Sequence, residues 1–272
     1  MRAWIDGKLL CDPTGPAVSV IDHGLTVGDG VFEAIKVVEG APFALDLHLE
    51  RLARSAAGLG LPVVDEALVR RGVDAVLDGQ DLPLGRIRIT VTGGPAPLGS
   101  GRGTHPPTVV VVAAPMTPQP PTAAVATVPW RRNEHGALAG LKTTSYAENV
   151  VALAEAQRRG ASEAIFANLA GHLCEGTGSN VFYGVAGDLR TPTLASGCLA
   201  GVTRALVLDW VGGREVDEPI EIAEGADEVF LVSTTRDVQA VTTWGERTLA
   251  IGPVTRAAAE TWRLREPELL GR

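Results

Sequence analysis

A dense run of prolines divides this chain and constrains its fold more than any other feature. The run is Pro115-Met116-Thr117-Pro118-Gln119-Pro120-Pro121. Proline lacks a backbone N–H and fixes its own φ, so this run predicts a stiff, extended connector. With 272 residues, the chain is long enough for two modest domains with buried cores. We therefore expect an N-terminal domain over 1–114, a linker over 115–121 and a C-terminal domain over 122–272.

Strand and helix patterns alternate on both sides of this linker. Before it, apolar periodicity predicts strands over 31–38, 86–92 and 108–114, and helices over 45–58 and 66–77. After it, the predicted strands are 123–128, 163–167, 172–175, 180–185, 229–232 and 238–243, and the predicted helices are 146–159, 202–210 and 254–263. The segment 93–107 has no such pattern and is long enough to be a binding loop. The pattern predicts a mixed α/β fold with short strands, of the α+β kind rather than a regular βαβ winding.

Composition excludes several classes of function. The net charge of −8 disfavours binding to phosphate backbones and to anionic membranes. The cysteines are few and widely spaced, and the histidines form no HxxxH pair, so we expect no disulfide framework and no metal site. The first residues lack the apolar core of a signal peptide, and no apolar stretch is long enough to span a bilayer. We expect a cytoplasmic protein that binds neither nucleic acid nor membrane.

Lysine is rare here, which shortens the list of amine nucleophiles. The lysines are Lys8, Lys36 and Lys142, and arginines supply the rest of the 24 basic residues. Lys142 lies in the segment 140–146, between a Gly/Ala-rich loop and a predicted helix, among small hydroxyl residues. A lysine amine becomes a nucleophile when burial or a nearby cation lowers its pKa. From the local sequence alone, Lys142 also fits a surface lysine whose stem covers apolar neighbours.

Two further segments contain residues suited to a flat, anionic ligand. Glu175 ends a predicted strand ahead of the flexible residues 176–179, so its carboxylate could pair with a ring nitrogen. The segment 199–204 opens a helix, whose free N–H groups and the Thr203 hydroxyl suit a phosphate. Arg51 could supply the counter-charge. Locally, a solvent-facing hairpin glutamate, an ordinary N-cap and a solvated helix arginine explain the same residues.

Together these segments resemble the signature of the class IV aminotransferase family, the fold-type IV pyridoxal-phosphate enzymes. The matching positions between 175 and 204 are Glu175, Asn180, Val181, Phe182, Leu189, Thr191, Leu199, Gly201, Val202 and Arg204. Further matches lie at 28–33, 48–52, 141–146, 227–230 and 233–235, so the resemblance covers essentially the whole chain. It implies a two-domain fold like that of the D-amino-acid aminotransferases: a smaller N-terminal α/β domain and a larger cofactor-binding domain with a β-barrel-like core. It also implies a homodimer.

The resemblance implies a role for each matched residue. Lys142 is expected to form the Schiff base with pyridoxal 5'-phosphate and then to move the substrate proton. Glu175 is expected to keep the pyridine nitrogen protonated, which makes the ring a better electron sink. The other expected cofactor contacts are Arg51, Tyr146, Ser179, Asn180, Leu199, Val202, Thr203, Ser233 and Thr234, and the expected substrate contacts are Phe32, Arg88, Arg102 and Thr235.

The family resemblance leaves the reaction open. The segment 99–103, with Arg102, resembles the arginine-bearing loop of some aminodeoxychorismate lyases, which release pyruvate and form 4-aminobenzoate in folate biosynthesis. Leu98 and Ser100 stand where the D-amino-acid branch has an Arg-x-His pair, which argues against that branch. The sequence thus favours a lyase. A class IV aminotransferase acting on branched-chain or other amino acids is the alternative, and a non-catalytic relative that only binds the cofactor is a more remote one.

Overall fold

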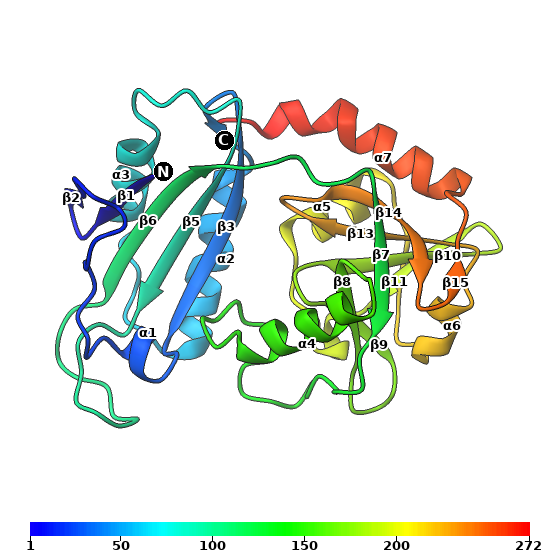
Figure 1. The fold of residues 1–272 in the computed structure, drawn as a ribbon, viewed down its shortest axis with the longest axis horizontal. Coiled ribbons are helices and arrows are strands. Elements are labelled where there is room, and N and C mark those ends of the chain that lie inside the picture. Colours follow the sequence, from blue (N-terminus) through cyan, green and yellow to red (C-terminus); the bar gives the residue numbers. More distant parts are fainter. The chain divides into compact units, whose positions relative to one another are not determined.

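The fold is that of a computed structural model, which describes all 272 residues. Its helices and strands form two compact units, and each is drawn in Figure 1. Unit 1 comprises Met1–Pro118, Leu141–Ser145 and Leu269–Arg272, and unit 2 comprises Gln119–Gly140 and Tyr146–Glu268. The first division falls within the proline run. The segment that carries Lys142 and the last four residues, however, pack with unit 1, which differs from the expected division at a single linker.

Unit 1 is built on an antiparallel sheet with two helices on one face (Figure 1). The sheet has six strands in the order β2-β1-β6-β5-β3-β4. The strands are β1 (Arg2–Ile5), β2 (Lys8–Leu9), β3 (Gly30–Val38), β4 (Ala41–Pro42), β5 (Leu84–Thr92) and β6 (Thr108–Pro115). The helices are α1 (His23–Thr26), α2 (Leu45–Leu59) and α3 (Glu66–Leu77).

The core of unit 1 lies between the sheet and helices α2 and α3. Side chains alternate across a strand, so every second residue of β3 and β5 faces these helices. These inward residues pack against the apolar stripes of the helices and form one cluster that includes Val31, Ile35, Val37, Ile87, Ile89, Leu49, Leu52, Val69 and Val73. The intervening residues of β3 and β5 lie on the opposite face, and that face carries the candidate residues described below.

Unit 2 is built on a larger, curled sheet of mixed direction (Figure 1). Its strand order is β12-β11-β10-β13-β14-β7-β8-β9, with β15 beside β14. The strands are β7 (Thr122–Thr127), β8 (Glu163–Ala167), β9 (Leu173–Gly176), β10 (Asn180–Val185), β11 (Asp188–Pro192), β12 (Arg214–Val216), β13 (Glu228–Ser233), β14 (Asp237–Trp244) and β15 (Arg247–Thr248). The helices are α4 (Ala147–Arg158), α5 (Val202–Trp210), α6 (Ile220–Glu224) and α7 (Pro253–Arg265), with short 3-10 turns at Leu194–Ser196 and Glu266–Leu269.

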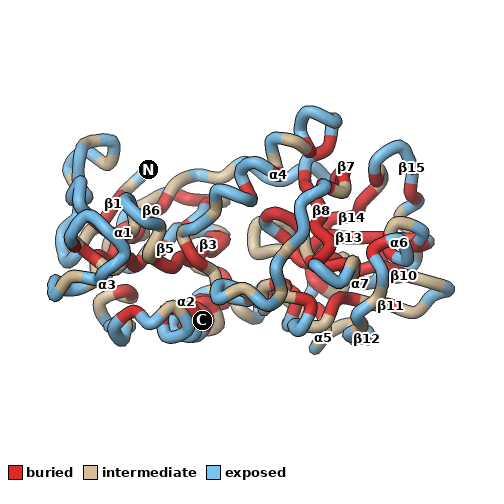
Figure 2. Tube along the Cα trace, turned by 90° about the horizontal axis from the view of Figure 1, so that it is seen from below, coloured by how far each residue is buried: buried red, intermediate tan, exposed pale blue.

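Unit 2 is buried mainly along its central strands. Figure 2 shows buried residues concentrated in β8, β13 and β14, whereas the helices and outer loops are exposed along much of their length. The rings of Phe182 and Phe230 stack between the paired strands β10 and β13, with centroids 5.1 Å apart. No helix of either unit is both long enough and apolar enough to cross a bilayer.

The periodic segments of the sequence are confirmed as elements of the predicted type. Four of them have the predicted bounds: Glu66–Leu77, Glu163–Ala167, Asn180–Val185 and Val202–Trp210. The elements that the sequence pattern missed are short, such as α1, β4, β12 and β15. Segments of two to four residues are too brief to show a period of 2 or 3.6, and tertiary contacts form them instead.

Candidate functional site

Strand β3 places the side chains of Phe32 and Glu33 on opposite faces of the unit 1 sheet. Glu33 lies between the core residues Val31 and Ile35, on the face covered by α2, and is fully buried. Phe32 lies on the other face. A glutamate on the apolar face of a strand needs partners there, because an unpaired charge is costly to bury. Helix α2 supplies those partners.

Glu33 forms a buried ion-pair network with two residues one turn apart on α2. Arg51 donates from Nε to Glu33 Oε1 at 2.8 Å and from Nη2 to Oε2 at 2.7 Å, a bidentate contact. His48 Nδ1 lies 2.8 Å from Glu33 Oε2. The planar guanidinium and the carboxylate fix each other's orientation through the two parallel bonds. The network therefore holds Arg51 in one orientation.

The network sets the protonation of both titratable partners. Burial alone would raise the pKa of Glu33, but the charge and hydrogen bonds of Arg51 and the hydrogen bond of His48 outweigh it and hold the pKa at about 2. Burial lowers the pKa of His48, and the positive charges of Arg51 and Lys142 add to this effect. Since the ionised Glu33 can only accept, the neutral imidazole carries its proton on Nδ1. This leaves His48 Nε2 buried without a partner.

Lys142 is held against the free edge of β3. Phe32 N donates to Lys142 O at 3.0 Å, Thr144 N donates to Gly30 O at 2.8 Å, and Val31 and Thr143 form an antiparallel bridge. Lys142 N also donates to the hydroxyl of Ser55 on α2 at 3.2 Å. The backbone around Lys142 thus behaves as a short extra strand of unit 1. Long-range pairing of this kind gives no periodic signal in the sequence.

The side chain of Lys142 extends to the ring of Phe32. Its Nζ lies 4.4 Å from the ring centroid, and Cζ of Arg88 lies 3.9 Å from the same centroid. Arg88 reaches the ring because it belongs to β5, where Thr90 is the direct partner of Phe32 and Arg88 is the diagonal one. The structure thus gathers three predicted site residues on the open face of the unit 1 sheet: an amine, a guanidinium and an aromatic ring.

In unit 2, the carboxylate of Glu175 is fixed at both oxygens. Leu199 N donates to Oε2 at 2.9 Å, and Nε of Arg132 lies 3.4 Å from Oε1. The side chain of Glu175 is only 15% exposed. Glu175 comes near the end of β9, and Leu199 lies in the segment before α5, so the bond joins two segments that the sequence singles out separately.

Asn180 ties the same segment to the sheet. It opens β10, and its Nδ2 donates to Leu199 O at 2.9 Å. Its Oδ1 lies so close to Gly201 that an added Cβ there would come within 2.1 Å of it. Gly201 therefore has to be a glycine. It is also the N-cap of α5 and offers that helix no side-chain cap.

Two buried hydroxyls of unit 2 have no partner within the protein. Thr203 lies in the first turn of α5, and its Oγ1 is buried and unpaired. Thr234 directly follows β13, which packs against α5, and its Oγ1 is in the same state. A buried hydroxyl without a partner costs about 1–3 kcal/mol, so such groups are rare unless a ligand completes them. An uncapped helix N-terminus with unpaired hydroxyls nearby suits an anion.

The remaining candidate residues of unit 2 have varied surroundings. Ser179 donates its hydroxyl to Glu163 Oε1 at 2.9 Å, so this hydroxyl has a partner inside the protein. Tyr146 is the residue before α4. Ser233 ends β13, and Thr235 follows Thr234 in the turn between β13 and β14. A ligand role for each of these residues stays a prediction.

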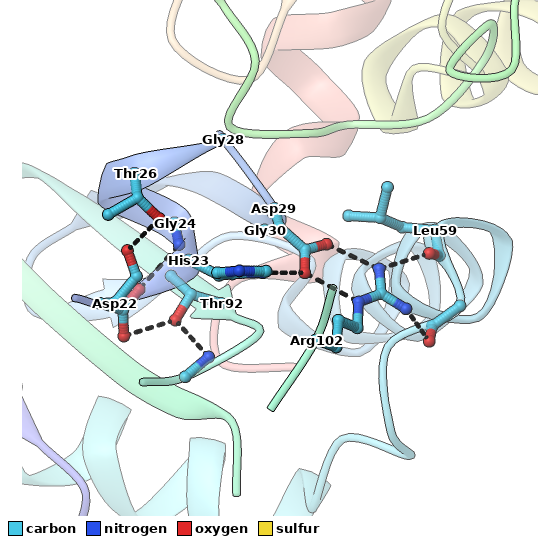
Figure 3. Close-up of polar contacts among 12 residues, drawn as sticks. Asp22, His23, Gly24, Thr26, Gly28, Asp29, Gly30, Leu59, Thr92 and Arg102 are labelled. Atoms are coloured by element: carbon cyan, nitrogen blue, oxygen red, sulfur yellow. Dashed lines mark hydrogen bonds and ion pairs between the residues drawn. The ribbon is translucent and has the colours of Figure 1, made fainter. Parts of the chain in front are cut away.

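Arg102 is held within unit 1 by four hydrogen bonds (Figure 3). It binds the carboxylate of Asp29 in bidentate fashion, at 2.8 and 2.6 Å. It also donates to Gly60 O and, at 2.7 Å, to Leu59 O at the end of α2. The hydrogen bond of Arg102 lowers the pKa of Asp29, which also contacts His23. This guanidinium caps a helix and anchors the loop 93–107. A substrate contact by Arg102, as the sequence predicted, would have to compete with these bonds.

Sequence reasoning missed three residues that contact the candidate site residues. Glu33 and His48 fall inside matched segments, but no role was expected for either from the sequence. The signal for Glu33 was a glutamate on the apolar face of a predicted strand. Arg132 follows Trp130 and Arg131 in a segment with no periodic pattern. Nothing in the sequence distinguishes it from its neighbour Arg131.

Comparisons with known proteins agree along nearly the whole chain. The sequence profile of the family described as Amino-transferase class IV matches residues 30–244. A protein of Methanocaldococcus jannaschii with the provisional name branched-chain-amino-acid aminotransferase is 32% identical, over 97% of this chain and 96% of its own length. The aminodeoxychorismate lyase of Bacillus subtilis is 31% identical, over 76% of this chain and 72% of its own. The crystal structure of a branched-chain aminotransferase from Thermoproteus uzoniensis, with norvaline, superposes with a TM-score of 0.91 at 31% identity, over 99% of this chain and 98% of that one.

Proposed function

The chain belongs to the class IV aminotransferases. We propose that it transfers the amino group of a small amino acid. In this proposal, Lys142 moves the substrate proton. Its cofactor is pyridoxal phosphate, and the family comprises aminotransferases and aminodeoxychorismate lyases. The observation that carries the proposal is the position of Lys142 Nζ and Arg88 Cζ on the ring of Phe32. An amine that moves a proton and a guanidinium that binds a carboxylate are the two groups that a reaction at the α-carbon of an amino acid requires.

Each unit, considered by itself, contains residues whose chemistry suits a cofactor that carries a phosphate and a pyridine nitrogen. The hydroxyls of Thr203 and Thr234, which have no partner within the protein, would donate hydrogen bonds to phosphate oxygens beside the N-terminus of α5. Glu175 would face the ring nitrogen, and the Arg51 guanidinium, oriented by Glu33, would supply positive charge. These assignments support the proposal through their chemistry, since each group matches one part of the cofactor.

When bound, pyridoxal phosphate supplies an electron sink for the carbanion that forms at the amine-bearing carbon. The protein's own groups do the rest. With the cofactor bound, Lys142 Nζ would take up the proton from the substrate carbon and later release it. Arg88 holds the substrate carboxylate, which orients the carbon toward Lys142. Phe32 gives both side chains an apolar surface and excludes water from one side of Lys142.

Transamination is favoured over pyruvate elimination by two observations. The sequence favoured a lyase because of the arginine in the loop 93–107, and this arginine is bound to Asp29 and to the end of α2. The relative named as a branched-chain-amino-acid aminotransferase also matches 97% of this chain in sequence, whereas the lyase of Bacillus subtilis matches 76%. The lyase stays the second candidate, because that relative is 31% identical.

Two measurements on the purified holoenzyme separate the candidates. For a transaminase, a single amino donor such as leucine, glutamate or alanine, in either enantiomer, converts the bound cofactor to its amine form and releases one keto acid per site. No second substrate is needed for this half-reaction. For a lyase, aminodeoxychorismate alone releases pyruvate and 4-aminobenzoate over many turnovers. Repeated turnover of aminodeoxychorismate without any half-reaction on amino acids would overturn our proposal in favour of the lyase.

Three further predictions accompany this proposal. We propose a homodimer, the commonest assembly of soluble oligomers, which size-exclusion chromatography with light scattering tests. We also propose that the protein is located in the cytoplasm. A role in folate biosynthesis follows only for the lyase, so the aminodeoxychorismate assay tests it as well.

A further inference from the structure

Arg132 is a partly buried arginine with no assigned role. Its backbone N donates to Ala167 O at 2.9 Å, and it pairs with Asn168 in a parallel bridge, so its position along the edge of unit 2 is fixed. Its guanidinium stacks on the ring of Phe166, with Cζ 4.0 Å from the centroid. The side chain is 15% exposed. The neighbouring Arg131, by contrast, is exposed.

Hydrogen bonds fix the far end of the guanidinium. Nη2 donates to Asn149 Oδ1 at 2.8 Å, and Nη1 donates to Glu148 in the first turn of α4. Asn149 is held in turn, because its Nδ2 donates to Thr177 O at 2.6 Å. Both terminal nitrogens therefore have partners on α4. The third nitrogen, Nε, forms no hydrogen bond with α4.

Among the guanidinium nitrogens of Arg132, Nε makes the ion-pair contact with Glu175. It lies 3.4 Å from Glu175 Oε1, an ion-pair contact without hydrogen-bond geometry, and no hydrogen bond satisfies this N–H. The other oxygen of Glu175 accepts from Leu199 N. The thiols of Cys174 and Cys198 also lie near Glu175. Burial raises the pKa of both, and the negative charge of Glu175 raises them further, so both stay neutral.

We propose that Arg132 is a positioning residue that keeps Glu175 ionised, so that the proton shared between Glu175 and the pyridine nitrogen of the cofactor stays on the nitrogen. The proposal rests on the proposed function, because it needs Glu175 to face that nitrogen. It adds a residue that touches neither cofactor nor substrate and acts only through Glu175.

The physical reason is a competition between two arrangements of one proton. In a site of low dielectric, a carboxylate beside a pyridinium competes with a neutral carboxylic acid beside a neutral pyridine, and burial favours the neutral pair. A fixed cation next to the carboxylate lowers the proton affinity of the carboxylate and shifts the proton toward the nitrogen. Glu148 also contacts Arg132, but its side chain is 51% exposed, so solvent screens its charge. Arg132 is a cation in contact with Glu175, whereas the Leu199 N–H contributes only a dipole.

The test is the ¹⁵N chemical shift of the ring nitrogen in holoenzyme loaded with ¹⁵N-labelled pyridoxal phosphate. This shift separates a protonated from an unprotonated pyridine nitrogen, and a merely structural role of Arg132 would not move it. We expect wild type and Arg131→Met to show a protonated nitrogen. Arg132→Met should move the signal toward the unprotonated position, and Arg132→Lys should restore much of the wild-type signal because it keeps the charge. Arg132→Gln, which can still donate to Asn149, replaces Arg132→Met if the latter does not fold.

Kinetics provide a second readout. We expect Arg132→Met to lower kcat about fivefold with KM nearly unchanged, because it weakens the electron sink rather than substrate binding. A wild-type nitrogen signal in both Arg132→Met and Arg132→Gln would overturn the proposal if Glu175→Gln moves that signal. If Glu175→Gln leaves the signal unchanged as well, then Glu175 does not face the nitrogen. In that case, the site assignment within the proposed function fails together with this inference.

Discussion

The basic candidate residue Arg51 of unit 1 has a buried carboxylate as its partner, whereas two buried hydroxyls of unit 2 have no partner at all. Arg51 forms two bonds to Glu33, whose pKa this contact helps to hold at about 2. Thr203 and Thr234, by contrast, leave their Oγ1 atoms unsatisfied. Among these candidate residues, unit 1 thus supplies a buried ion pair, and unit 2 supplies hydroxyls that no protein group satisfies. Substitutions in the Glu33–Arg51 network should therefore act mainly on folding, and those at the unpaired hydroxyls of unit 2 mainly on cofactor binding.

The largest effect is expected at Lys142. Because the proposed reaction moves a proton through this amine, Lys142→Ala should lower kcat by at least about 1,000-fold. The visible absorbance that arises from linkage to the lysine should disappear as well. Lys8→Ala is the matched control, since Lys8 is exposed at the edge strand β2. Lys142→Ala that keeps more than a tenth of the activity would remove Lys142 from the reaction.

The next largest effect concerns folding of unit 1. Glu33→Gln leaves Arg51 buried without its counter-charge, and breaking a buried pair typically costs about 3 kcal/mol. We expect chemical denaturation to show this loss in the apoenzyme, where no cofactor contributes. Glu50→Gln on the exposed side of α2 is the control. A loss below about 0.5 kcal/mol would mean that the network contributes little to folding.

The same network predicts how stability depends on pH. The pKa of Glu33 is about 2 in the folded protein against an ordinary 4.5, so its stabilisation is complete above pH 4.5 and is lost as the pH falls toward 2. Burial lowers the pKa of His48 below its ordinary 6.5, so the unfolded chain takes up that proton first and stability already declines below pH 6.5. Glu33→Gln should abolish its own contribution to the acidic part of the decline. A pH-independent unfolding free energy between pH 7 and pH 4 would contradict the burial of a neutral His48.

Glu175→Gln should have a smaller, kinetic effect. It removes the negative charge expected beside the ring nitrogen but keeps the shape of the side chain. We expect kcat to fall at least about tenfold, equivalent to about 1.4 kcal/mol of barrier, while the cofactor stays bound. Stopped-flow measurement of the half-reaction checks this directly. An unchanged rate would mean that the carboxylate faces another group.

The smallest effects are expected at the unpaired hydroxyls. Thr203→Val and Thr234→Val remove groups that have no protein partner, so the apoenzyme should be no less stable. Each should weaken cofactor binding by about 3- to 10-fold if the hydroxyl contacts the phosphate. Thr255→Val is the matched control, because Thr255 Oγ1 is likewise buried and unpaired but belongs to α7. Equal cofactor affinity in all these variants would contradict the phosphate assignment.

Arg102 of unit 1 has two competing interpretations, a substrate contact and a structural anchor. The sequence predicted a substrate contact, and hence a raised KM for a carboxylate substrate in Arg102→Ala. The bonds to Asp29 and to the end of α2 favour a loss of about 1 kcal/mol in stability with KM unchanged. Thermal unfolding and steady-state kinetics on the one variant decide between them. A raised KM with unchanged stability would restore the sequence-based assignment.

The sequence could predict the elements with clear periodicity and the motifs that lie within one segment. Helix α5 and strand β10 follow from short motifs, and the contacts of Glu175 and Asn180 with Leu199 join segments that the sequence singled out. The attachment of Lys142 to β3 could not be predicted in this way. It depends on an isolated bridge between Val31 and Thr143, which are far apart in the sequence. The contact between Arg132 and Glu175 likewise forms only once α4 and Phe166 hold the guanidinium in place.

The most direct test of the account is to find which residue holds the cofactor. Borohydride reduction of the holoenzyme fixes pyridoxal phosphate to the amine that carries it, and mass spectrometry of the digest identifies the labelled peptide. We predict a single labelled lysine, Lys142, in wild type, and no labelled peptide in Lys142→Ala. Label on Lys8 or Lys36, or a wild-type protein that takes up no cofactor, would contradict the account.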